Sequence, residues 1–192
     1  MNIWFISDLH LFHENMLRGG KIGIRPFDHV YEMHERIADE WAAKVKPLDK
    51  VYMLGDLTLE RRNERCGPVH DFVRLLPGQK RLLKGNHDHL ANEVYRAMGF
   101  EKVLAYREMA GILFSHIPVH PGQFYRFRGN VHGHAHESIV MRDQLVIREG
   151  GAALFLDPKP DERYINVCVE PRNYIPMSFD EIVAHYDALE KS

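Results

Sequence analysis

The chain has 192 residues, 45% of them hydrophobic and 27% charged, and a formal net charge of −2. This is the composition of an ordinary soluble globular protein, and the length favours a single domain over residues 1–192. The near-zero charge gives no bulk attraction to nucleic acids or membranes, although a local patch could, and two cysteines are too few for a disulfide scaffold or a multi-cysteine zinc finger.

The first half of the sequence alternates predicted strands with predicted helices. Strands are expected at Asn2–Ser7, Lys50–Leu54 and Arg81–Lys84, and helices at about His29–Val45, Val69–Leu76 and Ala91–Met98. In the first helix, apolar residues recur every three or four positions from Val30 to Trp41 and therefore share one face. Asp28 is the candidate N-cap of this helix.

Strands dominate the second half. They are expected around Val103–Met109, Ile112–Ser115, Gly129–His132, Ser138–Arg148 and Tyr164–Glu170. A capping box, Ser178-Phe-Asp-Glu181, opens a final helix. This order of elements predicts an α/β fold in which two packed β-sheets, a β-sandwich, are flanked by helices.

The N-terminal segment MNIWFISDLH has no basic region before a long apolar run, so it does not resemble a signal peptide. The apolar runs of the chain are far shorter than the roughly 18 residues that span a bilayer. We therefore expect a cytoplasmic protein without a membrane partner. In that reducing compartment Cys66 and Cys168 are expected to be small buried side chains; the alternative is a reactive thiol.

Thirteen residues are histidine, the commonest metal ligand, and several directly follow predicted strands. Five such segments also carry carboxylates or an amide: Asp8-Leu-His10, Gly55-Asp56, Gly85-Asn-His-Asp88, Ser115-His116 and Gly133-His-Ala-His136. Each segment alone has an ordinary explanation as a turn or a solvated loop. Independent turns have no reason to collect these residue types at successive strand ends, which is where α/β folds bind their ligands.

Mixed carboxylate, amide and imidazole ligands suit Mn2+, Fe, Zn2+ or Co2+ better than Mg2+ or Ca2+. Seven ligands are too many for one tetrahedral site, but they fit two ions that share a bridging carboxylate. Two ions about 3.5–4 Å apart can hold a bridging hydroxide and clamp a phosphate for in-line attack. The expected cofactors are therefore two divalent transition-metal ions, whose identity the sequence leaves open.

The ordered set DLH, GD, GNHD, SH and GHAH resembles the signature of the calcineurin-like metallophosphoesterase superfamily, over the span from Asp8 to His136. The segments DLHLFHENML and Arg25-Pro26-Phe27 resemble a compact bacterial and phage-type branch, although Phe12 stands where that branch often has glycine. The fold of the family, a two-sheet sandwich flanked by helices, agrees with the predicted element order.

The resemblance implies a role for each residue of the set. One metal ion would be held by Asp8, His10 and His136, the second by Asn86, His116 and His134, and Asp56 would bridge the two. His87 would be the catalytic residue, protonating the leaving alkoxide or stabilising its charge. Asp88 would orient His87; the alternative is that it only stabilises the turn.

One departure separates this chain from the protein Ser/Thr phosphatases, which carry a GDYVDRG-like segment and GNHE. Here the corresponding segments are Gly55-Asp-Leu-Thr-Leu-Glu-Arg-Arg62 and GNHD. Protein phosphatase activity is therefore not expected, and the phosphodiesterase and small-phosphoester branches are closer.

Three loops are expected at the rim of the site: Leu17–Phe27, Leu59–Pro68 and Ile117–Gly129. The candidate substrate-binding residues are His13, Arg25, Arg62 and Arg126, because arginine offers bidentate donors to phosphate. For each arginine, the alternative is an ordinary solvated charge.

The sequence favours hydrolysis of phosphodiester bonds in a small substrate, with nucleotides, including cyclic ones, as candidates and no obligate protein partner. A phosphomonoesterase or a nuclease with the same core is the alternative. A non-enzymatic scaffold is disfavoured because all seven ligand positions and His87 are present.

Overall fold

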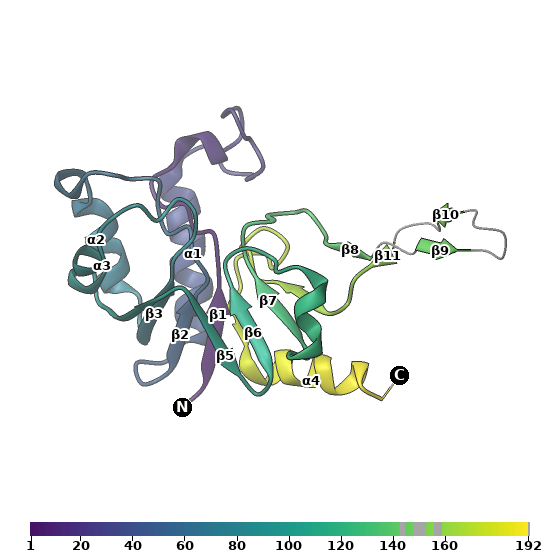
Figure 1. Cartoon of the computed structure of the whole chain (residues 1–192). Helices are drawn as coiled ribbons and strands as arrows, with labels where there is room; N and C mark the ends of the chain where they lie inside the picture. Colours follow the sequence, from purple (N-terminus) through teal and green to yellow (C-terminus); the bar gives the residue numbers. More distant parts are fainter. Residues whose placement is uncertain (143–144, 148–152, 156–158, 192) are drawn as a thin grey trace.

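The computed structural model describes residues 1–142, 145–147, 153–155 and 159–191. The chain forms two main β-sheets flanked by helices (Figure 1), which confirms the predicted fold class. Within the described residues, no helix combines the length and the apolarity that crossing a membrane requires.

The first sheet has five strands in the order β13-β1-β2-β3-β4. Their bounds are β1 (Ile3–Ile6), β2 (Lys50–Met53), β3 (Gln79–Leu83), β4 (Phe100–Leu104) and β13 (Met177–Ser178). Strands β1 to β4 run parallel, and β13 is antiparallel to β1. Parallel neighbours need crossover connections, and these contain α1 (Val30–Lys44), α2 (Gly67–Leu75) and α3 (Asn92–Ala97).

Both faces of the first sheet are buried, because successive side chains of a strand point to opposite faces. On one face, Ile6, Met53 and Leu82 lie in a core with residues of α1 to α3. On the other face, Phe5 and Leu83 lie in a second core that includes the second sheet. Strand β1 (IWFI) accordingly reads as a continuous apolar run, as expected for a parallel strand covered on both sides, whereas β3 (QKRLL) and β4 (FEKVL) carry polar residues as well.

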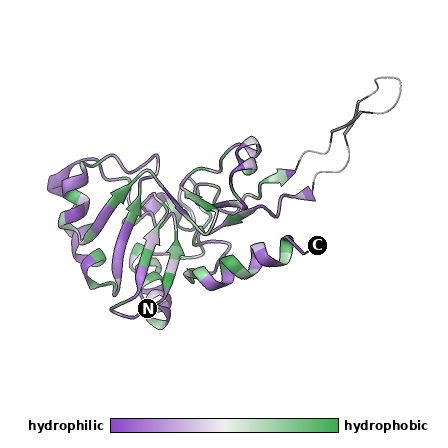
Figure 2. Cartoon of the chain, turned by 60° about the horizontal axis from the view of Figure 1, so that its bottom comes forward, coloured by the Kyte–Doolittle hydropathy of each residue, from purple (hydrophilic) through white to green (hydrophobic). Residues whose placement is uncertain are grey.

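The second sheet has the order β12-β7-β6-β5. Its strands are β5 (Tyr106–Met109), β6 (Ile112–Ser115), β7 (Gly129–His132) and β12 (Tyr164–Asn166). Only β5 runs antiparallel to its neighbour within this sheet. Helix α4 (Phe179–Leu189) mixes hydrophobic and hydrophilic residues along its length (Figure 2) and packs Ile182 and Tyr186 into the second core.

Several element boundaries differ from the prediction. The expected strand Val103–Met109 is divided at Ala105, since β4 belongs to the first sheet and β5 to the second. The expected strand Tyr164–Glu170 is paired as β12 only to Asn166, and Cys168 then makes an isolated bridge with Ser7. Helix α1 begins at Val30 with His29 as its N-cap, one residue after the predicted Asp28.

The expected strand Ser138–Arg148 corresponds to two short strands, and its residues 143–144 and 148 lie outside the described residues. Strand β8 (Met141–Arg142) pairs with β11 (Lys159–Pro160), and β9 (Leu145–Ile147) pairs with β10 (Ala153–Phe155). These strands extend away from the two main sheets (Figure 1). Short 3-10 helices lie in or beside the expected rim loops: η1 (Glu14–Met16), η2 (Asn63–Arg65) and η3 (Pro121–Tyr125).

The carboxyl ends of five strands determine where the site can form. Strands β1, β2 and β3 are parallel neighbours in the first sheet, and β6 and β7 are parallel neighbours in the second. The Asp- and His-containing segments predicted as ligands are the loops that leave these five ends.

Candidate metal centre

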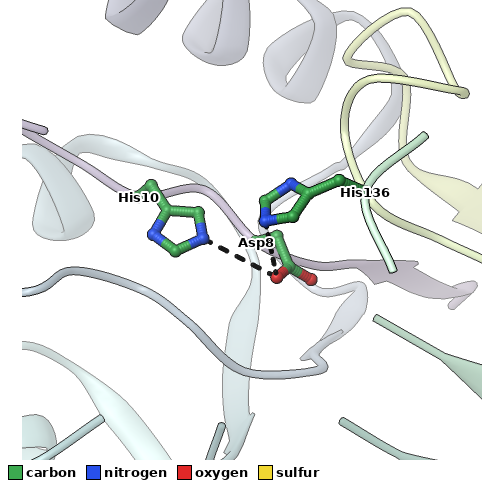
Figure 3. A group of neighbouring side chains, drawn as sticks. All are labelled: Asp8, His10 and His136. Atoms are coloured by element: carbon green, nitrogen blue, oxygen red, sulfur yellow. Dashed lines mark ion pairs between the residues drawn. The ribbon is translucent and has the colours of Figure 1, made fainter. Parts of the chain in front are cut away.

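Asp8, His10 and His136 form a first group of possible metal ligands (Figure 3). Each residue offers one ligand atom, and the three atoms lie within 4.8 Å of one another. The Nε2 atoms of His10 and His136 lie 3.7 and 3.9 Å from Oδ1 of Asp8. Asp8 and His10 follow β1 and His136 follows β7, so this group takes ligands from both sheets.

The first group contains buried polar atoms that have no hydrogen-bond partner among the described residues. They are Oδ1 of Asp8 and both ring nitrogens of His10. Buried polar groups in native proteins are almost always partnered, and a cation bound between these atoms would satisfy the carboxylate oxygen and an imidazole nitrogen. A carboxylate oxygen and two imidazoles are a donor set that suits a first-row transition-metal ion.

Asp56, His116 and His134 form a second group, again with ligand atoms within 4.8 Å of one another. Asn86 belongs to it as well, because its Oδ1 lies 2.8 Å from Nε2 of His116. Nδ1 of His116 lies 2.7 Å from the carbonyl oxygen of Leu54. In the neutral ring, a donor proton on Nδ1 leaves the lone pair on Nε2, the nitrogen that faces Oδ1 of Asn86 and Oδ2 of Asp56. His134 and Asn86 are exposed, so this group is open to solvent.

Asp56 lies between the two groups. Its Oδ2 is 3.8 Å from Nε2 of His10 in the first group and 3.4 Å from Nε2 of His116 in the second. Its Oδ1 accepts a hydrogen bond from the backbone N–H of His87 at 2.9 Å. This position fits a carboxylate shared by two ions.

The backbone is left-handed at five of the seven predicted ligands: Asp8, His10, Asp56, His134 and His136, with φ between 47° and 65°. Each such residue costs on the order of 1–3 kcal/mol, and strained residues of this kind cluster at functional sites. Glycines make room for the loops. A Cβ at Gly133 would overlap Oγ of Ser7 and Oδ2 of Asp8, and one at Gly85 would overlap Oδ1 of Asp56.

The electrostatics keep both carboxylates ionised. Burial by itself would raise the pKa of Asp8, but electrostatic attraction from His10 and His116 and the hydrogen bond from Ser7 outweigh it and hold that pKa well below its usual value. The same opposition, with His116 as the main partner, lowers the pKa of Asp56. An ionised carboxylate is the form that binds a cation.

The imidazoles divide according to their surroundings. Burial lowers the pKa of His10 and keeps its ring neutral. Burial would also lower the pKa of His116 and His136, but Asp56 raises the former and Glu170 the latter. A metal ion at these two histidines therefore has to displace a proton more often than at His10.

His87 lies beside the first group, with its ring centroid 5.7 Å from that of His10. The carboxylate of Asp88 takes a different place from the one predicted. It accepts hydrogen bonds from the backbone N–H groups of Asp56 at 2.8 Å, Leu57 at 3.1 Å and Gly85 at 2.8 Å, and no described contact joins it to the His87 ring. Asp88 therefore holds two ligand loops together, which is the turn-stabilising alternative.

The prediction that Arg25 binds substrate from the rim does not match its position. The residue is 1% exposed, and its guanidinium is hydrogen-bonded to Glu170 and to the carbonyl oxygens of Asp8 and Leu9. Arg25 was predicted to bind substrate because it lies in a polar loop that was expected to face solvent. In the structure, this loop directs the Arg25 side chain into the interior, beneath the first group. Arg62 and Arg126 are exposed, and among the described residues neither side chain contacts the candidate ligands.

His13 is half-buried, and its ring centroid lies 5.9 Å from that of His10. Burial lowers the pKa of His13 to about 4, so the ring is neutral near pH 7. It lines a cavity of about 220 Å³ together with Phe12, Thr58 and Glu60. This position agrees with the rim that the sequence suggests.

Sequence reasoning missed three residues that support the ligands. Oε1 of Glu170 lies 3.1 Å from Nδ1 of His136, and Oγ of Ser7 and Sγ of Cys168 both contact Oδ2 of Asp8. Glu170 ends the last predicted strand, so the strand-end rule that identified the ligands would have found it. Cys168 is buried as predicted, but nothing in the neighbouring sequence indicated its hydrogen bond with Asp8.

Comparison with known proteins gives the family. The model of the calcineurin-like phosphoesterases matches residues 1–147. An uncharacterized protein of Methanocaldococcus jannaschii is 30% identical over 184 residues, which cover 94% of this chain and 89% of that protein. The gene 66 protein of Mycobacterium phage L5 is 28% identical over 172 residues, covering 73% of this chain and 80% of that protein.

The solved structure of a protein of unknown function from Aquifex aeolicus has a TM-score of 0.65 and 26% identity, covering 95% of this chain and 98% of that one. The similarity therefore extends along nearly the whole chain in both sequence and fold. Together with the match over residues 1–147, this means that the chain belongs to the calcineurin-like phosphoesterases, a family of metal-dependent hydrolases of phosphoric esters.

Proposed function

We propose that this protein is a binuclear metal-dependent phosphodiesterase that acts on a small substrate, with nucleotides, cyclic ones included, as the candidate class. The observation that carries the proposal is the position of Asp56, whose Oδ2 lies within 4 Å of a histidine from each ligand group. Two groups that share one carboxylate suit a pair of ions that act on the same phosphate.

The proposed ligands follow from the two groups. Asp8, His10 and His136 would hold one ion, Asn86, His116 and His134 would hold the other, and Asp56 would be shared by both. Divalent ions bound here supply Lewis acidity and neutralise the charge of the phosphate oxygens. Mn2+ is our first candidate, because the mixed oxygen and nitrogen donors suit it, although Fe, Zn2+ and Co2+ suit the same set.

His87 is the proposed general acid. The hydrogen bond from its backbone N–H to Oδ1 of Asp56 fixes the residue beside the shared carboxylate, and its half-buried ring remains accessible. From this place the imidazole donates a proton to the leaving alkoxide, which is the group that most needs one when an ester bond to phosphorus breaks.

Two cavities favour a diester over a monoester. One, of about 220 Å³, is lined by His13, whose ring centroid lies 5.9 Å from that of His10 in the first group. The other, of about 370 Å³, borders the second group through Asn86 and His116, with Lys84 and Ile117 in its wall. A diester carries an organic group on two of its oxygens and can place one in each cavity, whereas a monoester would use only one.

The test compares bis-p-nitrophenyl phosphate with p-nitrophenyl phosphate, using protein purified without metal and then loaded with Mn2+. We expect a higher kcat/KM for the diester and no turnover after treatment with a chelator. A higher kcat/KM for the monoester would replace this proposal with a phosphomonoesterase. Hydrolysis of neither compound would overturn the proposed activity.

A second panel addresses the natural substrate. Cyclic nucleotides, mononucleotides and short oligonucleotides are assayed at equal concentration with the same Mn2+-loaded protein. The proposal expects cyclic nucleotides to react faster than mononucleotides. Exclusive cleavage of oligonucleotides would identify a nuclease instead.

A further inference from the structure

Arg25 and Glu170 form a buried ion pair directly beneath the first ligand group. Their side chains are 0% and 2% exposed, and Nη2 and Nε of Arg25 lie 2.7 and 2.9 Å from Oε1 of Glu170. Removing two charges from water is expensive, and a buried pair by itself is weak evidence for stability. The other contacts of the pair indicate a role at the ligand group instead.

The pair contacts Asp8 and His136 of the first group, and also Leu9, the residue before His10. On the arginine side, Nη2 donates to the carbonyl oxygen of Asp8 at 2.6 Å and Nη1 donates to that of Leu9 at 2.7 Å. On the glutamate side, Oε1 faces Nδ1 of His136 at 3.1 Å. Arg25 is therefore hydrogen-bonded to the loop that carries Asp8 and His10. Glu170 contacts His136, the ligand that comes from the other sheet.

These contacts orient the ligand residues. A proton on Nδ1 of His136, donated to Glu170, leaves the lone pair of the ring on Nε2, the nitrogen that faces Oδ1 of Asp8 (Figure 3). The loop that accepts hydrogen bonds from Arg25 has a left-handed backbone conformation at Asp8 and at His10. Such a backbone persists only where the surroundings determine it, and the two hydrogen bonds from the guanidinium do so.

We propose that Arg25 and Glu170 are positioning residues that set the affinity of the Asp8–His10–His136 group for its metal ion. Their direct contacts are with this group: Arg25 acts through the loop after β1, and Glu170 through the ring of His136. The inference rests on the proposed function only in requiring that this group binds a metal ion.

The test titrates metal-free protein with Mn2+ in a calorimeter at constant pH. The step that belongs to the first group is identified as the one that His136→Asn abolishes. We expect Glu170→Gln to weaken that step by about 10- to 100-fold, the usual effect of losing a group that orients a metal ligand. The other step should retain its affinity within about two-fold, because no contact of the pair reaches the second group.

A conservative variant separates positioning from mere folding. Arg25→Lys retains the charge but not the planar fork of donors, so it should lose affinity at the first step less than Arg25→Gln does. The control is Arg128→Gln, which breaks ion pairs with Asp187 and Glu190 at α4 and should bind both ions normally. If Glu170→Gln does not fold, the two Arg25 variants decide the question on the same criterion.

The outcomes distinguish the two proposals. Equal weakening of both steps, or unchanged affinity at the first step in folded variants, overturns the positioning role and leaves the proposed metal centre in place. If the unmodified protein itself binds no Mn2+, the metal centre of the proposed function fails, and the positioning role fails with it.

Discussion

Sγ of Cys168 lies 3.2 Å from Oδ2 of Asp8, although 160 positions separate the two residues in sequence. Oγ of Ser7 lies 2.5 Å from the same oxygen, and the backbone N–H of His134 donates to it at 2.9 Å. Burial raises the pKa of Cys168, so the thiol keeps the proton that it donates. With Oδ2 occupied by three donors, the other carboxylate oxygen, Oδ1, is left beside Nε2 of His10 and of His136, where it could join them in binding a cation.

Ser7→Ala removes only one oxygen atom, but it should therefore weaken the binding of the metal ion by the first ligand group. The loss of one hydrogen bond costs about 1 kcal/mol of unfolding free energy, and the loss of orientation should raise the dissociation constant of the first ion about 10-fold. The control is Ser178→Ala, which removes the N-cap of α4 at a similar cost of about 1 kcal/mol. Calorimetry that shows equal Mn2+ affinity in the two variants would contradict the orienting role.

Asp56→Asn and Asp8→Asn should have different effects on metal content. Asp56 faces histidines of both groups, whereas Asp8 faces those of the first. We expect Asp56→Asn to weaken the binding of both ions and Asp8→Asn to weaken mainly one. Elemental analysis after dialysis against limiting Mn2+ measures this directly. A single ion retained at full affinity by Asp56→Asn would show that its carboxylate does not bridge.

His87→Gln should retain both ions and lower kcat, because the side chain is not a ligand in either group. Loss of a general acid costs about 10²–10⁴-fold in rate, and the loss should grow as the leaving group becomes a stronger base. A series of aryl and alkyl phosphodiesters measures the trend. His70→Gln, a change on the outer helix α2, serves as the control. Loss of metal in His87→Gln would reassign the residue as a ligand.

Gly133→Ala should damage both the fold and the first metal step. The new Cβ would overlap Ser7 and Asp8, and overpacking of this kind costs about 1–3 kcal/mol. Gly67→Ala is the matched control, since nothing lies within 4 Å of its Cβ position; it should change stability by no more than about 0.5 kcal/mol. Urea unfolding of the two variants, with and without Mn2+, measures both effects. Equal stability would mean that the loops relax freely around Gly133.

His34 should make the fold less stable in mild acid. Burial lowers its pKa to about 4 from an ordinary 6.5, and its Nε2 accepts a hydrogen bond from the backbone N–H of Phe12, which requires the neutral ring. Between these two pKa values the unfolded chain binds more protons than the folded one. The contribution of His34 is therefore complete above pH 6.5 and is lost as the pH falls towards 4, by up to about 3 kcal/mol.

The measurement is the urea unfolding free energy of metal-free protein at several pH values between 7 and 4.5. His34→Gln retains an acceptor but does not titrate, so its free energy should fall less steeply with decreasing pH. Parallel curves for the two proteins would show that folding does not lower the pKa of His34.

The sequence was a good guide to the candidate ligands because one rule applies to all of them. Apolar runs mark the strands, and parallel strands bring the residues after their carboxyl ends to one edge. The structure brings Asp8, His10 and His136 together in this way, and likewise Asp56 with His116. The order of strands and turns was enough to identify the set of candidates, whereas their division between two ions came from the family resemblance.

The sequence was a poor guide where tertiary contacts decide. The run from Val103 to Met109 has no local break, and only packing shows that Ala105 passes from one sheet to the other. The residues around Arg25 have the composition of a solvated loop. Arg25 is nevertheless buried, where it pairs with Glu170, 145 positions away. Partners this distant leave no periodic pattern in either segment.

The division of ligands between the sheets has a consequence for the stability of the protein, apart from its catalytic role. Each group includes residues from loops of both sheets, so an ion in either group would act as a cross-link between the two halves of the sandwich. A ligand at 100 times its dissociation constant adds about 2.7 kcal/mol to the free energy of unfolding. The resistance of this enzyme to heat and proteases would then follow the supply of transition metal around it.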